Sequence, residues 1–449
     1  MNVLIVFVLA GLMQAIRSFD APYNGLGLGT TLAFGYLLLT AYFAGTLFKA
    51  ARLPKLTGYI AAGIVVGPAV LGFLNEPMVQ SLKIVNGVAI ALIAMTAGTE
   101  LEFRTMRPLM RTILWITVIA VMGTVGLLAT AVFFARGLLP FMANLDSQQS
   151  MLIALVLGVV MVAQSPAVVM ALRDETQAEG PVSRTVLGVV VIADLAVILM
   201  FAITSSLAKA FLGQGADVSQ TAWALAWELF GSMGVGALIG SLLALYTTKV
   251  KAGAGLFLLA VAFILAEVGQ RLHLDPLLAA LAAGMLIRNA STAAEEIHHQ
   301  IEAFSLPIYV LFFAVAGANL HISVLASVGL PAVMFVVVRG IGLYYGTRIA
   351  TAFAGAPKDV QRFAGFGLLP QAGLALALSM LFTKTFPEFG ADAGALTLGV
   401  VALNELVAPV IYRWALVRSG EAGKLAPSMQ ADIVSGDESG LVDLGPEHG

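Results

Sequence analysis

Asp194 is the residue of this chain best placed to do chemistry. It is the only ionisable residue in the apolar run 187–201, and no other charge stands between Arg184 and Lys209. A helix of this length spans a bilayer, so the sequence places the carboxylate near mid-depth. Ionisable residues at that depth are costly, and they normally face a protein interior or a wet cavity on an ion or proton pathway. The alternative is a buried Asp that only hydrogen-bonds a neighbouring helix.

Two other apolar segments carry proline and polar side chains in their middles, at Gln164-Ser165-Pro166 and at Pro370-Gln371. Proline removes a backbone hydrogen bond and kinks a helix, and in lipid the freed carbonyls need partners. We therefore predict two broken helices. Gln164, Ser165 and Gln371 could supply oxygen ligands to a small hard cation, together with unwound carbonyls. The alternative is a packing kink capped by its own polar side chains.

Two more charges fall inside apolar segments, and both need partners. Arg339 is the only basic residue clearly within a predicted span, and Glu405 is the only charge between Asp392 and Arg413. An unpaired buried charge costs several kcal/mol. We therefore expect Arg339 to neutralise either Glu405 or Asp194, and the sequence does not choose between them. The alternative is an arginine that snorkels to the surface.

Composition sets the class of protein. The 449 residues are 59% apolar and 11% charged, with a mean hydropathy of +0.94, which excludes a soluble domain and predicts an all-α polytopic membrane protein. A net charge of -2 gives no argument for a nucleic-acid partner. There is no cysteine, and the five histidines lack metal-ligand spacing within a span. We expect neither an enzyme nor a cofactor, and no metal beyond a transported cation.

Hydrophobic segments organise the whole chain. Residues 1–16 form an apolar run without a basic start, so an extra N-terminal helix over 1–17 is favoured over a signal peptide. The polar residues 418–449 are typical of a disordered cytoplasmic tail. Between them we predict thirteen helical segments, at about 30–50, 56–74, 80–101, 109–135, 151–172, 185–208, 223–247, 254–270, 275–288, 303–320, 330–352, 362–382 and 393–417.

The basic residues test this topology, because cytoplasmic loops carry excess Lys and Arg. If successive connections alternate between the two membrane faces, one face collects 17 of the 24 basic residues and the other six, with Arg339 as the remaining one. A missed or invented helix would scramble this division. The asymmetry predicts a multi-pass protein of the cell membrane with a cytoplasmic C-terminus.

An internal repeat relates the two halves of the chain. The matching segments are seven helices apart, and because seven is odd the two halves must insert with opposite orientations. Secondary transporters built from such inverted repeats bind substrate near the midplane, where interrupted helices of the two halves meet. The matched pairs are 58–63 with 278–284, 97–101 with 316–320, Pro166 with Pro370, and 187–195 with 398–406.

Over about residues 30–417 the chain resembles the monovalent cation:proton antiporter-2 family, within the cation/proton antiporter superfamily. The resemblance rests on the segments 58–68, 97–102, 164–166, 266–284 and 367–373, together with Asp194. It implies a homodimer in the lipid bilayer that exchanges Na+ or K+ for H+ at Asp194, beside two crossing broken helices. It also implies a scaffold that includes the dimer contact, over 30–79 and 223–290, and a mobile core over 80–208 and 301–417.

One residue departs from the family pattern. Members usually carry Asp, Asn or Gln immediately before the essential Asp, and here that position is Ala193, which offers neither a ligand nor a second titratable group. We therefore expect an electroneutral cation:proton antiporter that works by alternating access. Two rival classes are a solute or ion symporter of the same architecture, which would need a larger midplane cavity, and a non-transporting sensor or channel, which would tolerate loss of Asp194.

Overall fold

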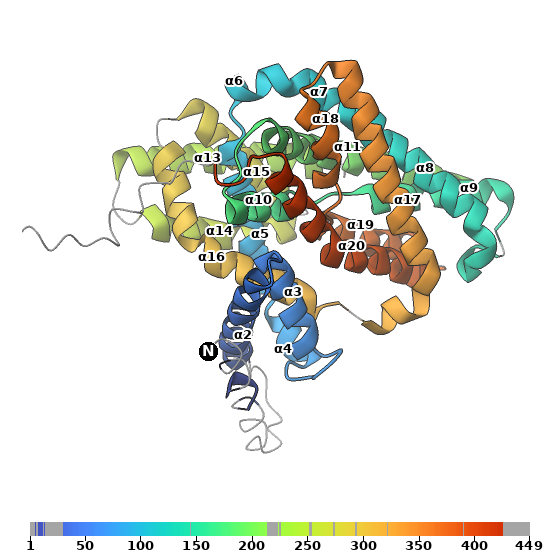
Figure 1. Ribbon diagram of the computed structural model, residues 1–449, viewed down its shortest axis with the longest axis horizontal. Coiled ribbons are helices and arrows are strands. Elements are labelled where there is room, and N and C mark those ends of the chain that lie inside the picture. The colour runs from blue at the N-terminus through green and yellow to red at the C-terminus, as the bar shows by residue number, and fades with distance from the viewer. Residues whose placement is uncertain are drawn as a thin grey trace, which may run out of the picture.

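The chain folds into a bundle of helices, as a computed structural model shows (Figure 1). The structure describes residues 30–424, with short gaps at 144, 213–222, 224–225, 251–253, 273, 292–293, 321 and 389, and a few isolated residues before 30. No strand occurs among these residues. The expected N-terminal helix over 1–17 and most of the expected tail lie outside the described residues.

All thirteen expected segments contain helix, and several of them are divided into shorter helices, among them 109–135, 151–172, 223–247 and 362–382. The first half contains α2 (Thr30–Ala50), α3 (Lys55–Val66), α4 (Glu76–Ser81), α5 (Lys83–Glu100), α6 (Phe103–Met106), α7 (Met110–Trp115), the π-helical η2 (Ile116–Met122), α8 (Gly123–Phe134), α9 (Ser147–Val162), α10 (Pro166–Thr176) and α11 (Pro181–Phe211). The second half contains η5 (Trp227–Gly231), α13 (Ser232–Lys249), α14 (Ala254–Leu272), α15 (Pro276–Ala290), α16 (Ala294–Ala318), α17 (Ile322–Ala354), α18 (Lys358–Gly367), α19 (Gly373–Thr385) and α20 (Gly390–Arg418).

One expected segment is shorter than its hydrophobic run. The run 56–74 is helical only to Val66, because Gly67 is extended and the next residue is Pro68. The residue before a proline is disfavoured in the helical conformation, so the helix ends there. Among the described residues, six helical stretches are long and apolar enough to cross a membrane, and six shorter apolar helices accompany them.

Close glycine contacts join α5 to α15. A Cβ atom on Gly98 would lie 2.3 Å from the carbonyl oxygen of Leu281, and one on Gly284 would lie 2.2 Å from that of Met95. No side chain fits at either position, so the two helix backbones touch directly. Small residues at helix interfaces in membranes permit this approach.

The same contact recurs between α3 and α16. A Cβ atom on Gly63 would lie 2.0 Å from the carbonyl oxygen of Ala314, and one on Gly317 would lie 2.2 Å from that of Ile60. Gly63 and Gly284 are repeat-mates in the sequence, as are Gly98 and Gly317. The two contacts are therefore one contact made twice, and the inverted repeat predicted from the sequence is confirmed in the fold.

The helices form two groups that lie side by side (Figure 1). One contains α2, α3 and α13 to α16, and the other contains α7 to α9, α11 and α17 to α20, with α10 between them. α5 and α16 pack mainly on α15 and α3, which are helices of the expected scaffold. Both of them thus pack on helices that the resemblance assigns to the scaffold, although the resemblance assigns α5 and α16 themselves to the core.

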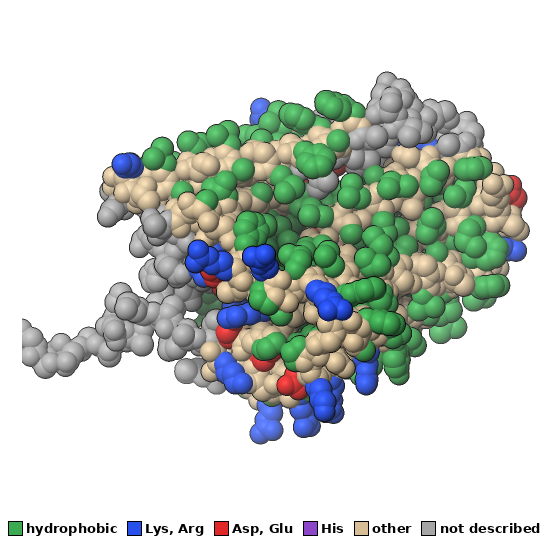
Figure 2. All heavy atoms as spheres, turned by 90° about the horizontal axis from the view of Figure 1, so that it is seen from above, with side chains coloured by type: hydrophobic (Ala, Val, Ile, Leu, Met, Phe, Trp, Pro, Cys, Tyr) green, Lys and Arg blue, Asp and Glu red, His purple; other side chains and the backbone are tan. Residues whose placement is uncertain are grey.

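The outer surface of the bundle is largely apolar. Figure 2 shows hydrophobic side chains over most of one face, while Lys and Arg gather toward its lower edge. Large apolar side chains such as Phe134, Leu256 and Leu330 are more than 70% exposed. An apolar surface of this extent belongs against lipid.

Candidate functional site

The first broken helix has its break where Pro166 predicts it. α9 ends at Val162, residues 163–165 are not helical, and α10 begins at Pro166. Proline suits the first position of a helix because its missing N–H is not needed there. Ser165 is the N-cap of α10, and its hydroxyl accepts a hydrogen bond from the backbone N–H of Val168 at 3.3 Å.

The second broken helix repeats this arrangement in the other half. α18 ends at Gly367, residues 368–372 are not helical, and α19 begins at Gly373. Pro370 lies in the middle of the break, and Gln371 follows it, completely buried. The two breaks leave several backbone carbonyls without helical partners in the interior of the bundle.

Arg339 of α17 supplies those carbonyls with donors. Its guanidinium donates to the carbonyl oxygen of Ala163 at 3.0 Å, in the first break, and to those of Leu368 and Leu369 at 3.2 and 2.6 Å, in the second. The side chain is completely buried. Because the planar guanidinium carries five donors in a fixed fork, one side chain can serve both breaks.

The expected ion pair of Arg339 is therefore wrong. Among the described residues Arg339 makes no salt bridge with Asp194 or with Glu405. The physical reason is that unwound carbonyls in an apolar interior also need a positive donor, and several partial negative charges take the place of one carboxylate. The alternative of a snorkelling arginine is also excluded by its burial.

Gln371 ties the two breaks together from the other side. Its amide nitrogen donates to the carbonyl oxygens of Met161 at 2.7 Å and of Ala163 at 3.1 Å. Its amide oxygen accepts from the side chain of Asn404 at 2.9 Å. Both the nitrogen and the oxygen of the Gln371 amide are thus hydrogen-bonded. Gln371 supports the site by linking the two breaks.

Asn404 is the polar residue of this network to which sequence reasoning gave no part. It lies on α20, donates to Gln371, and receives a long 3.5 Å contact from Arg339. A signal was available, because Asn404 is the repeat-mate of Ala193, the position where the family usually has a polar residue. The first repeat has no polar side chain at this position, which is Ala193, whereas the second repeat has the amide of Asn404.

Asp194 and Gln164 differ from this satisfied network. Asp194 is 1% exposed, and neither of its carboxylate oxygens has a hydrogen-bond partner among the described residues. Gln164 is also 1% exposed, and neither its amide oxygen nor its nitrogen has one. Buried polar atoms are nearly always hydrogen-bonded, so atoms without a partner indicate a functional role or a site that binds an ion.

The position of Asp194 relative to the second break follows from its apolar neighbours. Leu195 and Leu374, the second residue of α19, pack in one small cluster with Ile198 and Leu278. This stretch of α11 therefore lies against the start of α19 and the first turn of α15. Asp275, the N-cap of α15, is within electrostatic range of Asp194.

The two remaining predicted site residues, Ala193 and Glu405, are also buried. Ala193 is completely buried and offers no ligand. Glu405 is 2% exposed, and its Oε2 atom has no hydrogen-bond partner among the described residues. Asp194 and Glu405 are thus buried carboxylates in equivalent helices of the two repeats.

The helix that carries Asp194 is fixed at its start by a residue from the far end of the chain. The carboxylate of Glu421 accepts hydrogen bonds from the backbone N–H groups of Val182 at 2.6 Å and Ser183 at 2.8 Å. A carboxylate at a helix N-terminus satisfies free N–H groups and interacts favourably with the helix dipole. Glu421 is 4% exposed, so this cap is protected from water.

A helical bundle with two crossed breaks and a buried carboxylate beside them defines a class of secondary transporter. Residues 37–418 match the family described as sodium/hydrogen exchanger, transmembrane, which is most of the chain. The chain therefore belongs to the sodium/hydrogen exchanger family. This confirms the resemblance to cation/proton antiporters, a family of transporters and not of enzymes.

Curated relatives are distant. The Na(+)/H(+)-K(+) antiporter GerN of Bacillus cereus is 25% identical over 360 residues, which cover 76% of this chain and 85% of GerN. The probable Na(+)/H(+) antiporter 3 of Methanocaldococcus jannaschii is 20% identical over 84% of this chain and 93% of that protein. The iron transporter MagA of Paramagnetospirillum magneticum is 29% identical over 169 residues, so this chain matches only 36% of its length.

Solved structures support the same fold. The sodium proton antiporter MjNhaP1 of Methanocaldococcus jannaschii superposes with a TM-score of 0.64 at 15% identity, covering 89% of this chain and 100% of that one. At this identity the likeness concerns the fold alone. It confirms the expected all-α membrane fold of the antiporters.

Proposed function

We propose that the protein exchanges Na+ or K+ for H+ at Asp194. The observation that carries this proposal is a buried carboxylate in the middle of a membrane helix, with no hydrogen-bond partner on either oxygen among the residues that the structure describes. Such a group is stable in the apolar interior only if it binds a proton or a cation. The family of the chain and the names of GerN and MjNhaP1 agree with this chemistry.

Competition for one carboxylate gives the exchange mechanism. Burial favours the protonated form of Asp194, whereas a bound cation favours the charged form, so each ligand displaces the other. The amide oxygen of Gln164 is the second ligand that we propose, because it has no partner among the described residues. The Ser165 hydroxyl can contribute its remaining lone pair while it caps α10.

The breaks support this site without taking its charge. Arg339 binds carbonyls of both breaks and leaves Asp194 unpaired. Gln371 and Asn404 keep the two breaks in register with each other.

Alternating access requires one group of helices to move against the other. We propose that the core consists of α7 to α11 and α17 to α20, and that α5 and α16 move with the scaffold. This differs from the expected division, because direct backbone contacts at Gly98 and Gly63 tie these two helices to α15 and α3. Asp194 lies where the core meets α15, through Ile198 and Leu278.

Further parts of the proposal concern charge and assembly. One exchangeable proton at Asp194 and none at Ala193 make the exchange electroneutral. On the excess of Lys and Arg at one face, we propose that the C-terminus and the connection between α10 and α11 are cytoplasmic. We also propose a homodimer, on the family resemblance alone.

The decisive experiment is ion flux in proteoliposomes with and without a pH gradient. Asp194→Asn keeps the size of the side chain but cannot exchange a proton, so flux should fall to background. Asp392→Asn is the matched control, since Asp392 is an exposed acid in the first turn of α20. Full exchange in Asp194→Asn would exclude the site and favour a channel or sensor. Cation flux in the same direction as protons would indicate a symporter.

A further inference from the structure

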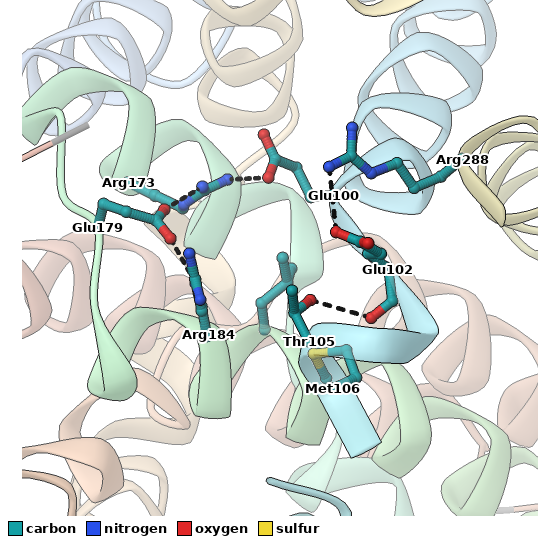
Figure 3. Close-up of a pocket in the computed structure, with 9 residues that line it drawn as sticks. Glu100, Glu102, Thr105, Met106, Arg173, Glu179, Arg184 and Arg288 are labelled. Carbon is teal, nitrogen blue, oxygen red and sulfur yellow. Dashed lines mark hydrogen bonds and ion pairs between the residues drawn. The ribbon is translucent and has the colours of Figure 1, made fainter. Parts of the chain in front are cut away.

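The C-terminal turn of α10 connects the proposed core to the proposed scaffold through charged side chains. Arg173, which is 4% exposed, binds the carboxylate of Glu100 at 2.9 Å, at the end of α5. Its other nitrogen binds Glu179, which also binds Arg184, and both of these residues follow α10 (Figure 3). Arg173 is therefore held on the core side and reaches across to α5.

The two residues after Arg173 also reach across. The carboxylate of Asp174 accepts a hydrogen bond from the hydroxyl of Tyr309 in α16 at 3.1 Å. The carboxylate of Glu175 accepts one from the backbone N–H of Lys55, the first residue of α3, at 2.8 Å. Three consecutive residues of one helix turn thus bind three different scaffold helices, α5, α16 and α3.

We infer that Arg173, Asp174 and Glu175 form a latch that holds the cytoplasmic side of the transporter closed. The inference rests on the proposed function and on the proposed orientation. A latch on one short turn can release all three scaffold helices in one movement of α10. Its bonds are charge-assisted or buried, so they are strong enough to hold a conformation yet can be exchanged for water when the turn moves.

A neighbouring ion pair provides a matched control. Glu102 lies two residues after Glu100, and both residues line the pocket that Figure 3 shows. The carboxylate of Glu102 binds Arg288 at 3.2 Å. Glu102 lies in the connection between α5 and α6, and Arg288 is on α15, so this pair does not involve the turn at the end of α10. The carboxylates of Glu100 and Glu102 have the same chemistry at the same end of the molecule, and only Glu100 is part of the latch contact.

The absence of cysteine from the sequence allows a direct distance measurement. Spin labels are placed at Lys49→Cys on α2 and Arg418→Cys on α20, which are exposed ends of a scaffold and a core helix. The labelled chain is reconstituted into nanodiscs with excess unlabelled chain, so that distances between subunits do not contribute. Double electron–electron resonance then gives the populations of closed and open cytoplasmic ends.

We expect Glu100→Gln and Tyr309→Phe each to raise the ratio of long to short distances about tenfold, equivalent to about 1.4 kcal/mol. Tyr309→Phe removes only a hydroxyl, which leaves an apolar side chain that should fold. Glu102→Gln should leave the ratio unchanged. If neither latch variant moves the distribution, or if Glu102→Gln moves it equally, the latch does not exist.

The outcome is independent of the flux assay. A shift in distance without any flux in the parent protein would support the latch and overturn the proposed exchange. Flux that depends on Asp194, with unchanged distances in both latch variants, would support the proposed exchange and overturn the latch.

Discussion

Arg339 donates a hydrogen bond to the carbonyl oxygen of Ala163 at 3.0 Å, although the two residues are 176 positions apart in the chain. The same guanidinium binds Leu369 in the other repeat. One side chain therefore joins the interrupted helices of both halves. Its charge is used to stabilise backbone and not to neutralise an acid, which has consequences for stability and for transport.

Replacing Arg339 by Ala should lower the free energy of unfolding by about 3 kcal/mol or more, because each buried carbonyl left without a donor costs about 1 to 3 kcal/mol. Arg339→Lys should restore little of it, since a compact ammonium cannot span both breaks. Thermal unfolding in detergent measures this. Arg348→Ala is the control, an exposed arginine on the same helix, and should change little.

A second substitution separates this explanation from an ion pair. Glu405→Gln should not restore the stability of Arg339→Ala, because the two side chains form no salt bridge among the described residues. Restored stability in the double variant would mean that the two charges neutralise each other after all.

Gly98→Ala should destabilise the protein by about 1 to 3 kcal/mol, as an added methyl group would press on the backbone of α15 at Leu281. Gly317→Ala, its repeat-mate, should have a similar cost. Gly126→Ala in α8 is the control, because no atom lies within 4 Å of the added carbon. In this helix Ala is favoured over Gly, so the control should be neutral or slightly stabilising. Equal melting temperatures for Gly98→Ala and the parent would show that α5 and α15 are not in contact.

Glu179 should make the stability of the protein depend on pH. Partial burial opposes its charge, but the hydrogen bonds and positive charges of Arg173 and Arg184 outweigh this and hold the pKa of Glu179 below its usual value. A carboxyl group whose folded pKa is lowered stabilises the fold above its unfolded pKa, about 4.3, and loses that contribution as the pH falls through the folded value.

The unfolding temperature should therefore fall in acid, and Glu179→Gln should weaken that fall while costing about 1 kcal/mol near pH 7. Melting curves between pH 3 and pH 8 provide the comparison. Glu267→Gln, which removes the exposed pair with Arg271, is the control and should leave the acid dependence unchanged. An identical acid profile for Glu179→Gln and the parent would contradict the assignment.

The proposed electroneutral exchange predicts that membrane voltage does not move the transport equilibrium. Moving one elementary charge is worth about 2.3 kcal/mol per 100 mV, so a single uncompensated charge would be visible. Opposed cation and proton gradients in proteoliposomes, with the potential clamped by another ion, give the null point. Because Glu405 is not paired with Arg339, it is the group to test if the null point moves. Glu405→Gln should then abolish the voltage dependence.

Sequence patterns predicted the features that depend on local chemistry. Pro166 and Pro370, each next to polar residues in an apolar run, located both breaks. Proline alone does not mark a break, because Pro307 and Pro409 lie inside α16 and α20. The isolation of Asp194 in an apolar run predicted its burial. The order of matched segments predicted the inverted repeat, which Gly98 and Gly317 then made visible in the packing.

Features that depend on contacts between distant segments were not predictable in the same way. The partners of Arg339 are backbone carbonyls, and no residue type marks an unwound carbonyl in a sequence. Glu421, which caps α11, lies 239 positions after Val182, whose N–H group it binds. The packing of α5 on α15 depends on backbone contact at glycines, which composition alone does not assign to a partner helix.

The long separations of these contacts also bear on biosynthesis. When α11 enters the membrane, the carboxylate that will cap its first turn has not yet been synthesised, and neither has the guanidinium that will bind Ala163. Until α17 has been made, the carbonyl of Ala163 therefore lacks this donor in an apolar environment, and until Glu421 has been made the first turn of α11 lacks its cap. We expect a ribosome-released fragment ending after α11 to be a substrate for membrane proteases, and only the arrival of α17 and α20 to complete the first half.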